Sequence, residues 1–283
     1  MRSDRPVRAE QMTGAVTHHG EGPVWWPDGS GLRCVDMLAG DVLTLAGDGS
    51  VDRVHVGGVA AVVRPRRAGG SVVAVERGFL LQDDDGTVTP LDPVWTDTGI
   101  RMNEGGCDPD GRLWCGSMAY DQAPGAASVY RLDPDRSVRA VLGGVTVSNG
   151  LDWSPDGTLA YYNDSGLKRT DVFDVVDGEL VNRRLFRDGD GTPDGLTVDS
   201  AGNVWTAING LGRVRCFSPA GELLADVDLP VRGATACTLG GEDLRDLYIT
   251  TSKEGLDDPE PEAGSVLRIR VDVPGRPVLP FAG

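Results

Sequence analysis

Residues 191–205 read GTPDGLTVDSAGNVW, and this stretch decides the fold. It holds a carboxylate, Asp194, between a proline and a glycine, then a short apolar run, then the turn DSAG that ends at Gly202. A second apolar run follows. Turns favour glycine, proline, serine and aspartate, whereas short runs of valine, leucine and tryptophan favour strands. The stretch therefore predicts two strands joined by a tight turn, with a charged side chain where the first strand begins.

Three other stretches repeat this pattern. They are EGPVWWPDGSGLRCVD from Glu21, NEGGCDPDGRLWCGS from Asn103 and NGLDWSPDGTLAYYND from Asn149. In each of the four stretches, the polar residue stands eight positions before the glycine of the turn. These glycines are Gly29, Gly111, Gly157 and Gly202. Their spacing fits a unit of about 45 residues, with one further copy inside the long first interval.

A second series of turns lies between these glycines, so that each unit has two hairpins. The turns are at Gly49, Gly86, Arg136, Gly178 and Gly221. Two hairpins give four strands, and four-stranded units of about 40 to 50 residues are typical of β-propeller blades. At this period the 283 residues hold six units.

The sequence thus predicts an all-β fold, a six-bladed β-propeller with four-stranded antiparallel blades around a central channel. We expect one domain over residues 1–283, in which about residues 1–14 form an N-terminal extension. A β-sandwich, the alternative, has regular turns but would not keep so long a register.

The shared offset of eight residues predicts a site as well as a fold. It puts Glu21, Asn103, Asn149 and Asp194 at equivalent positions, each just before the innermost strand of its blade. Innermost strands line the channel, so these side chains should meet at one end of it. Carboxylate and amide oxygens suit a hard cation such as calcium, which would also neutralise neighbouring carboxylates. The alternative is that all four residues only form turns, but Glu21 is not a turn-forming residue.

The composition argues against several classes of partner. Acidic residues number 43 against 27 basic ones, a formal charge of −16, which disfavours nucleic-acid and anionic-membrane surfaces. No apolar run is long enough for a signal peptide or a transmembrane span, so we expect a cytoplasmic protein. The five cysteines are scattered and predict neither disulfides nor a thiolate metal site. We expect a monomer, because the blades close upon themselves. We also expect the substrate to be a small molecule.

The same motifs resemble the family of regucalcin, gluconolactonases and luciferin-regenerating enzymes. The resemblance rests on GEGPVW, RMNEGGCDPDGRLWCGSM, SNGLDWSPDG, PDGLTVDSAGNVW and LGGEDLRDLYITTS. It implies a six-bladed propeller with one divalent metal ion in the channel, often calcium, and an activity on sugar lactones or related esters. By motif, Glu21, Asn149 and Asp194 resemble the metal ligands of this family.

The resemblance also implies substrate-binding residues. Arg101 and Asn103 match the arginine and asparagine of the R-x-N-D-G motif, which moves Asn103 from a fourth metal ligand toward substrate. Asp121 falls near the acidic residue that follows GTM in the family. This sequence departs from the motifs of the family at two places: Glu104 replaces the aspartate of R-x-N-D-G, and GSMAYD replaces GTM and its following glutamate. The resemblance therefore does not determine which lactone is the substrate.

The resemblance thus implies a metal-dependent hydrolase that opens a lactone. A cation, calcium first and zinc, manganese or magnesium as alternatives, would polarise the carbonyl, while Asp194 accepts a proton from the attacking water. Glu104 or a histidine, His18 or His19, are the alternatives for the base. Two other functions stay open: a metal-dependent hydration, cyclisation or rearrangement in a specialised biosynthetic pathway, and a non-catalytic calcium-binding protein.

Overall fold

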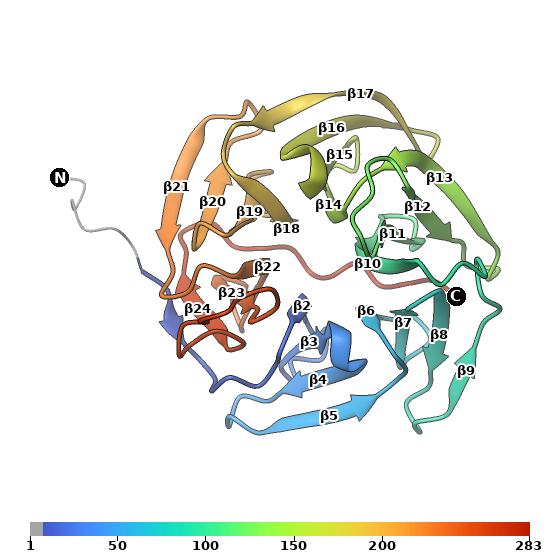
Figure 1. Ribbon diagram of the computed structural model, residues 1–283, viewed down its shortest axis with the longest axis horizontal. Helices are drawn as coiled ribbons and strands as arrows, with labels where there is room; N and C mark the ends of the chain where they lie inside the picture. Colours follow the sequence, from blue (N-terminus) through green and yellow to red (C-terminus); the bar gives the residue numbers. More distant parts are fainter. Residues whose placement is uncertain (1–7) are drawn as a thin grey trace.

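Six antiparallel sheets form a ring around a central channel in the computed structural model, which describes residues 8–283 (Figure 1). Each sheet has four strands, as two hairpins per unit predict. The prediction of a six-bladed β-propeller is therefore confirmed. Two single-turn 3-10 helices, η1 (Met37–Ala39) and η2 (Ser165–Leu167), lie between strands of the first and fourth blades.

Five blades consist of four consecutive strands each, and in each of them the chain runs from the innermost strand to the outermost. The first has β2 (Gly20–Trp25), β3 (Leu32–Asp36), β4 (Asp41–Leu45) and β5 (Val51–His55). The second has β6 (Ala60–Pro65), β7 (Ser71–Val75), β8 (Gly78–Gln82) and β9 (Val88–Pro90). The third has β10 (Ile100–Cys107), β11 (Leu113–Ala119), β12 (Ala127–Leu132) and β13 (Val138–Val145). The fourth has β14 (Ser148–Trp153), β15 (Leu159–Asp164), β16 (Arg169–Val176) and β17 (Glu179–Asp188). The fifth has β18 (Thr192–Val198), β19 (Val204–Asn209), β20 (Arg213–Phe217) and β21 (Leu223–Asp228).

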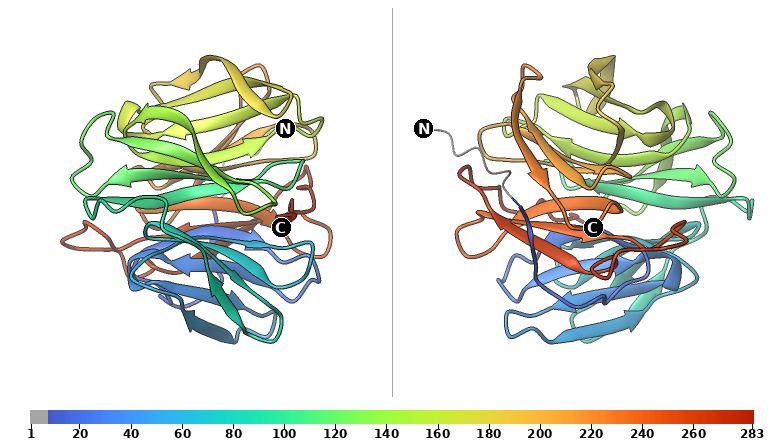
Figure 2. Two further views of the ribbon diagram at one scale, coloured as in Figure 1. Left: turned by 90° about the vertical axis from the view of Figure 1, so that its right-hand side faces the viewer. Right: turned by 60° about the vertical axis from the view of Figure 1, so that its left-hand side comes forward.

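The sixth blade joins the two ends of the chain. Its inner strands are β22 (Ala234–Gly240), β23 (Asp246–Thr251) and β24 (Val266–Arg270), and its outermost strand is β1 (Glu10–Gln11). Figure 2 shows the dark blue segment that holds β1 beside the red strands of this blade. The extension predicted over about residues 1–14 includes β1, which pairs with β24 and covers its free edge, while residues 1–7 lie outside the described residues.

Every innermost strand shifts its register against the next strand, close to its own start. The shifts lie between Glu21 and Val24, Ala60 and Val62, Met102 and Gly105, Ser148 and Leu151, Pro193 and Leu196, and Ala234 and Ala236. The extra residue of such a bulge bends the strand and re-aims a side chain. The missing copy of the repeat is in the second blade, where Ala61 stands eight residues before Gly69.

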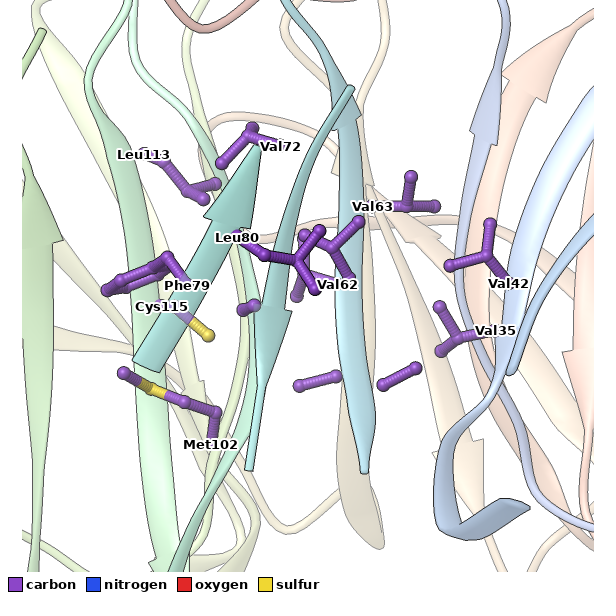
Figure 3. Packing of buried hydrophobic residues seen from close by; sticks show 14 of the residues in the cluster. Val35, Val42, Val62, Val63, Val72, Phe79, Leu80, Met102, Leu113 and Cys115 are labelled. Carbon is purple, nitrogen blue, oxygen red and sulfur yellow. The ribbon is translucent and has the colours of Figure 1, made fainter. Parts of the chain in front are cut away.

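Apolar side chains fill the space between neighbouring blades. In Figure 3, Val62 and Val63 project to opposite sides of β6, with Val63 on the side of Val42 in the first blade. Both valines are fully buried, and burial of such a side chain contributes about 1.5 to 3 kcal/mol. This packing fixes the innermost strands around the channel. The five cysteines are buried and free, and no helix among residues 8–283 is long and apolar enough to cross a membrane.

Candidate metal and substrate site

The four polar residues of the repeat lie on innermost strands, at the bulges. Glu21 is on β2, Asn103 on β10, Asn149 on β14 and Asp194 on β18, and each residue is at most 5% exposed. Asn103 and Asn149 touch, with 3.3 Å between Nδ2 of the former and Oδ1 of the latter. The bulges therefore bring polar side chains from separate blades together at the end of the channel where the innermost strands begin.

Asp194 presents one oxygen to a protein donor and keeps the other free. Its Oδ2 accepts a hydrogen bond from Nδ2 of Asn209, at 2.8 Å. Its Oδ1 has no hydrogen-bond partner within residues 8–283. The backbone carbonyl of Asp194 accepts from Nδ2 of Asn163 at 2.6 Å, which fixes the bulge itself. A buried acceptor without a donor is costly, so a bound cation would satisfy this oxygen.

A relay of hydrogen bonds orients the amide of Asn149. Ser165 donates its hydroxyl hydrogen to the carbonyl of Pro193, at 2.6 Å, and accepts from Nδ2 of Asn149, at 2.8 Å. Ser165 holds the side-chain nitrogen of Asn149, so Oδ1 of Asn149 faces the other polar groups of the channel. Asn149 therefore offers an oxygen to a cation.

Arg101 and Asn103 form a second, adjoining unit on β10. Nη1 of Arg101 donates to Oδ1 of Asn103, at 2.7 Å, and to the carbonyl of Met102, at 3.0 Å. Nδ2 of Asn103 donates to the carbonyl of Ser148 at 2.8 Å. Burial lowers the pKa of the Arg101 guanidinium. The unit is a buried set of donors beside the carboxylates, suited to the oxygens of a polar substrate.

Three buried carboxyl groups influence one another along the channel. Burial raises the pKa of Asp194 to about 7. Burial, and then the charge of Asp194, raise the pKa of Glu104 to about 8. Burial, followed by the charges of Asp194 and Glu104, holds the pKa of Glu21 well above its usual range. A divalent cation would oppose these shifts, because it favours the ionised form of each group.

The donor set fits a hard cation held by few protein ligands. No group of three or more His, Cys, Asp or Glu side chains with metal-binding arrangement occurs among the described residues. Glu21 and Asp194 with the amide oxygen of Asn149 would be the ligands, and water or substrate would complete the coordination. The buried Oδ1 of Asp194, which has no partner in residues 8–283, supports this fit.

Two predicted substrate residues lie outside the group formed by Arg101 and Asn103. Asp121 is exposed in the turn after β11, where its carboxylate accepts from the backbone N–H of Ala123 at 3.0 Å. Glu104 is 5% exposed and lines a cavity at the opposite end of the channel. Its neighbour Asn103 lies among the other polar groups because the bulge between Met102 and Gly105 interrupts the alternation of side chains.

The two histidines differ in their surroundings. Nδ1 of His19 hydrogen-bonds to Oγ of Ser252 at 2.7 Å, and burial, followed by the charge of Arg101, lowers the pKa of His19 to about 4. His19 therefore stays neutral near pH 7. His18 is exposed and pairs with Glu254, at 2.8 Å.

Three residues of the site were not found from the sequence: Asn163, Ser165 and Asn209. Asn163 and Ser165 belong to the stretch YYNDS, and Asn209 ends the run NVWTAIN, but neither stretch by itself marks these residues as groups of the channel. Asn163 and Ser165 lie at the end of β15 and just after it, and Asn209 ends β19. The strand register alone places them, because β15 pairs with β14 and Asn209 pairs with Thr192 of β18.

Comparisons with known proteins identify related sequences and structures. The profile of the SMP-30/Gluconolactonase/LRE-like region matches residues 19–253. Regucalcin of Sus scrofa is 36% identical, in a comparison that covers 98% of this chain and 99% of that protein. The 6-deoxy-6-sulfogluconolactonase of Pseudomonas putida is 36% identical over 279 residues, which cover 93% of this chain and 95% of that protein. Among solved structures, a luciferin-regenerating enzyme matches with a TM-score of 0.90 and 28% identity, covering 99% of this chain and 100% of its own.

The fold and the site define a six-bladed propeller with carboxylate and amide oxygens gathered at one end of its channel. The chain belongs to the SMP-30/gluconolactonase/LRE-like family. This confirms the resemblance seen in the motifs of the sequence.

Proposed function

We propose that this protein is a divalent-metal-dependent hydrolase that opens a lactone, with sugar lactones as the leading substrate class. One observation carries the proposal: Asp194 is held by Asn209 through one oxygen and keeps the other unpaired, within residues 8–283, among the polar groups of the channel. Membership of a family that includes the sulfogluconolactonase of Pseudomonas putida supports the substrate class.

The proposed cation ligands are Glu21, Asn149 and Asp194. Calcium is the leading ion, because all three supply oxygen, and zinc, manganese and magnesium are the alternatives. When bound, the ion would polarise the lactone carbonyl and lower the energy of the negative charge that develops on its oxygen.

The residues of the chain would do the rest of the chemistry. Asp194 accepts the proton of the attacking water, and Asn209 keeps its carboxylate oriented during the transfer. Arg101 and Asn103 hydrogen-bond the hydroxyl groups and the ring oxygen of the substrate, and so hold its carbonyl near the water. Glu104 does not serve as the base in this proposal, because it lines the cavity at the far end of the channel. Asp121, exposed in the turn after β11, stays a predicted contact for substrate hydroxyls.

The proposal includes a monomeric protein that acts in the cytoplasm on a small molecule. Closure of the ring by β1 and β24 supports the monomer. The acidic charge of −16 supports the small-molecule partner over a nucleic acid or an anionic membrane.

A panel of sugar lactones, assayed after chelation and after restoring each metal, tests the proposal. We expect turnover that chelation removes and that one divalent ion restores. Asp194→Asn should lower kcat by about 100-fold or more, since it removes the proton acceptor and the negative charge of a metal ligand. Asp135→Asn is the control, because Asp135 is an exposed turn carboxylate. Tight metal binding without turnover of any lactone would reject lactone hydrolysis. It would favour either a different reaction at this site or a non-catalytic calcium-binding protein.

A further inference from the structure

A large cavity lies at the end of the channel opposite Arg101 and Asn103. Its volume is about 720 Å³, within the range of small-molecule sites. The later halves of the innermost strands and the turns that follow them line it. The C-terminal segment also crosses here, as Figure 1 shows, and Arg276 to Leu279 form part of the wall. We call this cavity the lower chamber.

Glu104 gives the lower chamber a buried, unpaired acceptor. The residue lines the chamber and is 5% exposed. Its Oε2 has no hydrogen-bond partner in the described part of the chain, and no ion pair among residues 8–283 includes Glu104. Its Oε1 lies against the backbone of β18, since a Cβ added to Gly195 would be 2.9 Å from it. Glu104 therefore enters the chamber from a fixed position with a carboxylate oxygen unused.

The two arginines of the lower chamber are already engaged elsewhere. Arg64 donates through Nη1 and Nη2 to the carbonyls of Val63, at 2.8 Å, and Gly105, at 2.6 Å. Arg276 donates to Oδ1 of Asp152, at 3.1 Å, and to the carbonyl of Trp153, at 2.7 Å. Neither guanidinium hydrogen-bonds to Glu104, although the charge of Arg64 acts on Glu104 at longer range and opposes the rise of its pKa. Both guanidinium groups donate their hydrogen bonds to the walls of the chamber, so the carboxylate of Glu104 keeps no donor within the described residues.

The rest of the lining adds negative charge at the mouth and apolar surface inside. Asp28 and Glu242 are exposed carboxylates that line the chamber, so its acidic groups outnumber its basic ones. Leu151, Leu196 and Leu239 line the interior and are each at most 6% exposed. Such a lining attracts a cation and also stabilises an apolar group attached to it.

We propose that the lower chamber is a second ligand site, which takes a small organic cation with a protonated amine and a compact apolar body. The ammonium group pairs with the carboxylate of Glu104, and the body packs against the three leucines. This ligand is not the substrate of the proposed hydrolase, whose site lies at the other end of the channel.

Titration of the metal-loaded protein with benzylammonium and with benzyl alcohol, its neutral counterpart of the same shape, tests the proposal. We expect the ammonium compound to bind at least tenfold more tightly by calorimetry. Glu104→Gln keeps the shape of the side chain and should remove this preference. Thr238→Trp should fill the chamber and block both compounds, whereas Thr238→Ser should not.

Glu21→Gln, at the other end of the channel, separates the two sites, because it should weaken metal binding while the protein keeps its preference for benzylammonium over benzyl alcohol. Equal affinity for the amine and the alcohol would overturn the proposal. So would the absence of binding, or a preference for the amine that survives in Glu104→Gln. Should Thr238→Trp fail to fold, a crystal structure with benzylammonium decides, because density outside the chamber would also overturn it.

Discussion

Nδ2 of Asn209 lies 2.8 Å from Oδ2 of Asp194, and the other oxygen of Asp194 has no partner within residues 8–283. Asn209 ends β19 and Asp194 stands near the start of β18, so the pairing of these two strands creates the contact. The amide thereby selects which carboxylate oxygen faces the channel. Partners of this kind orient metal ligands, and their loss weakens the site without removing a ligand.

Asn209→Ala should lower metal affinity or kcat/KM by about 10- to 100-fold, because Asp194 loses the donor that orients it. Calorimetric metal titration and steady-state kinetics on the same preparation measure the two effects. Gln82→Ala is the control, since it removes a half-buried side-chain amide of β8, far from the site. Unchanged affinity and kcat/KM in Asn209→Ala would show that Asp194 needs no such support.

Ser165→Ala should weaken metal binding by about tenfold, because the amide of Asn149 loses the acceptor that fixes its orientation. It should also cost about 1 to 3 kcal/mol of stability, since a buried hydrogen bond to the carbonyl of Pro193 is lost. Metal titration and urea unfolding measure these effects. Ser137→Ala, which removes an exposed hydroxyl, should change neither. A Ser165→Ala protein with full metal affinity would contradict the orienting role.

Gly150→Ala should destabilise the protein by about 1 to 3 kcal/mol, the typical cost of overpacking. Gly150 follows Asn149 on β14, and a Cβ there would lie 2.3 Å from the backbone nitrogen of Leu196 and 2.7 Å from its Cγ. The strands β14 and β18 would have to separate, which also displaces Asn149 from Asp194. Gly14→Ala is the matched control, because nothing lies within 4 Å of a Cβ at that position. Equal unfolding midpoints for the two variants would refute this tight approach.

The stabilisation that a bound cation gives should grow as the pH rises from about 4 to 8. In the metal-free protein, burial raises the pKa of Asp194 to about 7, and burial with the charge of Asp194 raises that of Glu104 to about 8. A carboxyl group with a raised pKa in the folded state stabilises the protein fully below its unfolded pKa, and this contribution is lost as the pH rises through the folded pKa. The metal-free protein should thus lose stability over this range, and the cation should offset the loss.

Thermal melts of chelated and metal-loaded samples at several pH values measure this effect. The difference in Tm between the two samples cancels groups remote from the site. We expect a small difference near pH 5 and a larger one near pH 8. A difference that is constant with pH, or that shrinks as the pH rises, would contradict raised carboxyl pKa values in the metal-free site.

The repeat predicted six blades, and it located its copies only where they carry a polar residue. The offset of eight residues found Glu21, Asn103, Asn149 and Asp194, because each is polar and precedes a glycine turn. The spacing predicted the copy in the second blade but did not locate it, since its equivalent residue is Ala61. Strand β1 has only two residues, both polar and exposed, so no apolar pattern marks it. Strand β1 forms only by pairing with the free edge of β24, which lies at the other end of the sequence.

The site was predictable to the extent that its residues stand on innermost strands. Asn163, Ser165 and Asn209 reach it from other segments, and only the register of pairing shows that they do. For Glu104, in contrast, closeness in sequence to a site residue was misleading. It is the neighbour of Asn103 in sequence, yet the bulge in β10 directs it to the lower chamber. Adjacent residues of one motif thus serve two ends of the channel.

A crystal structure of the protein grown with calcium or manganese, with the ion located by its anomalous signal, tests the central claim most directly. The account predicts one ion per chain, bound by carboxylate oxygens of Glu21 and Asp194 and by Oδ1 of Asn149, at about 2.3 to 2.6 Å for calcium. An ion bound elsewhere, or a channel with no ion at concentrations that support turnover, would contradict it.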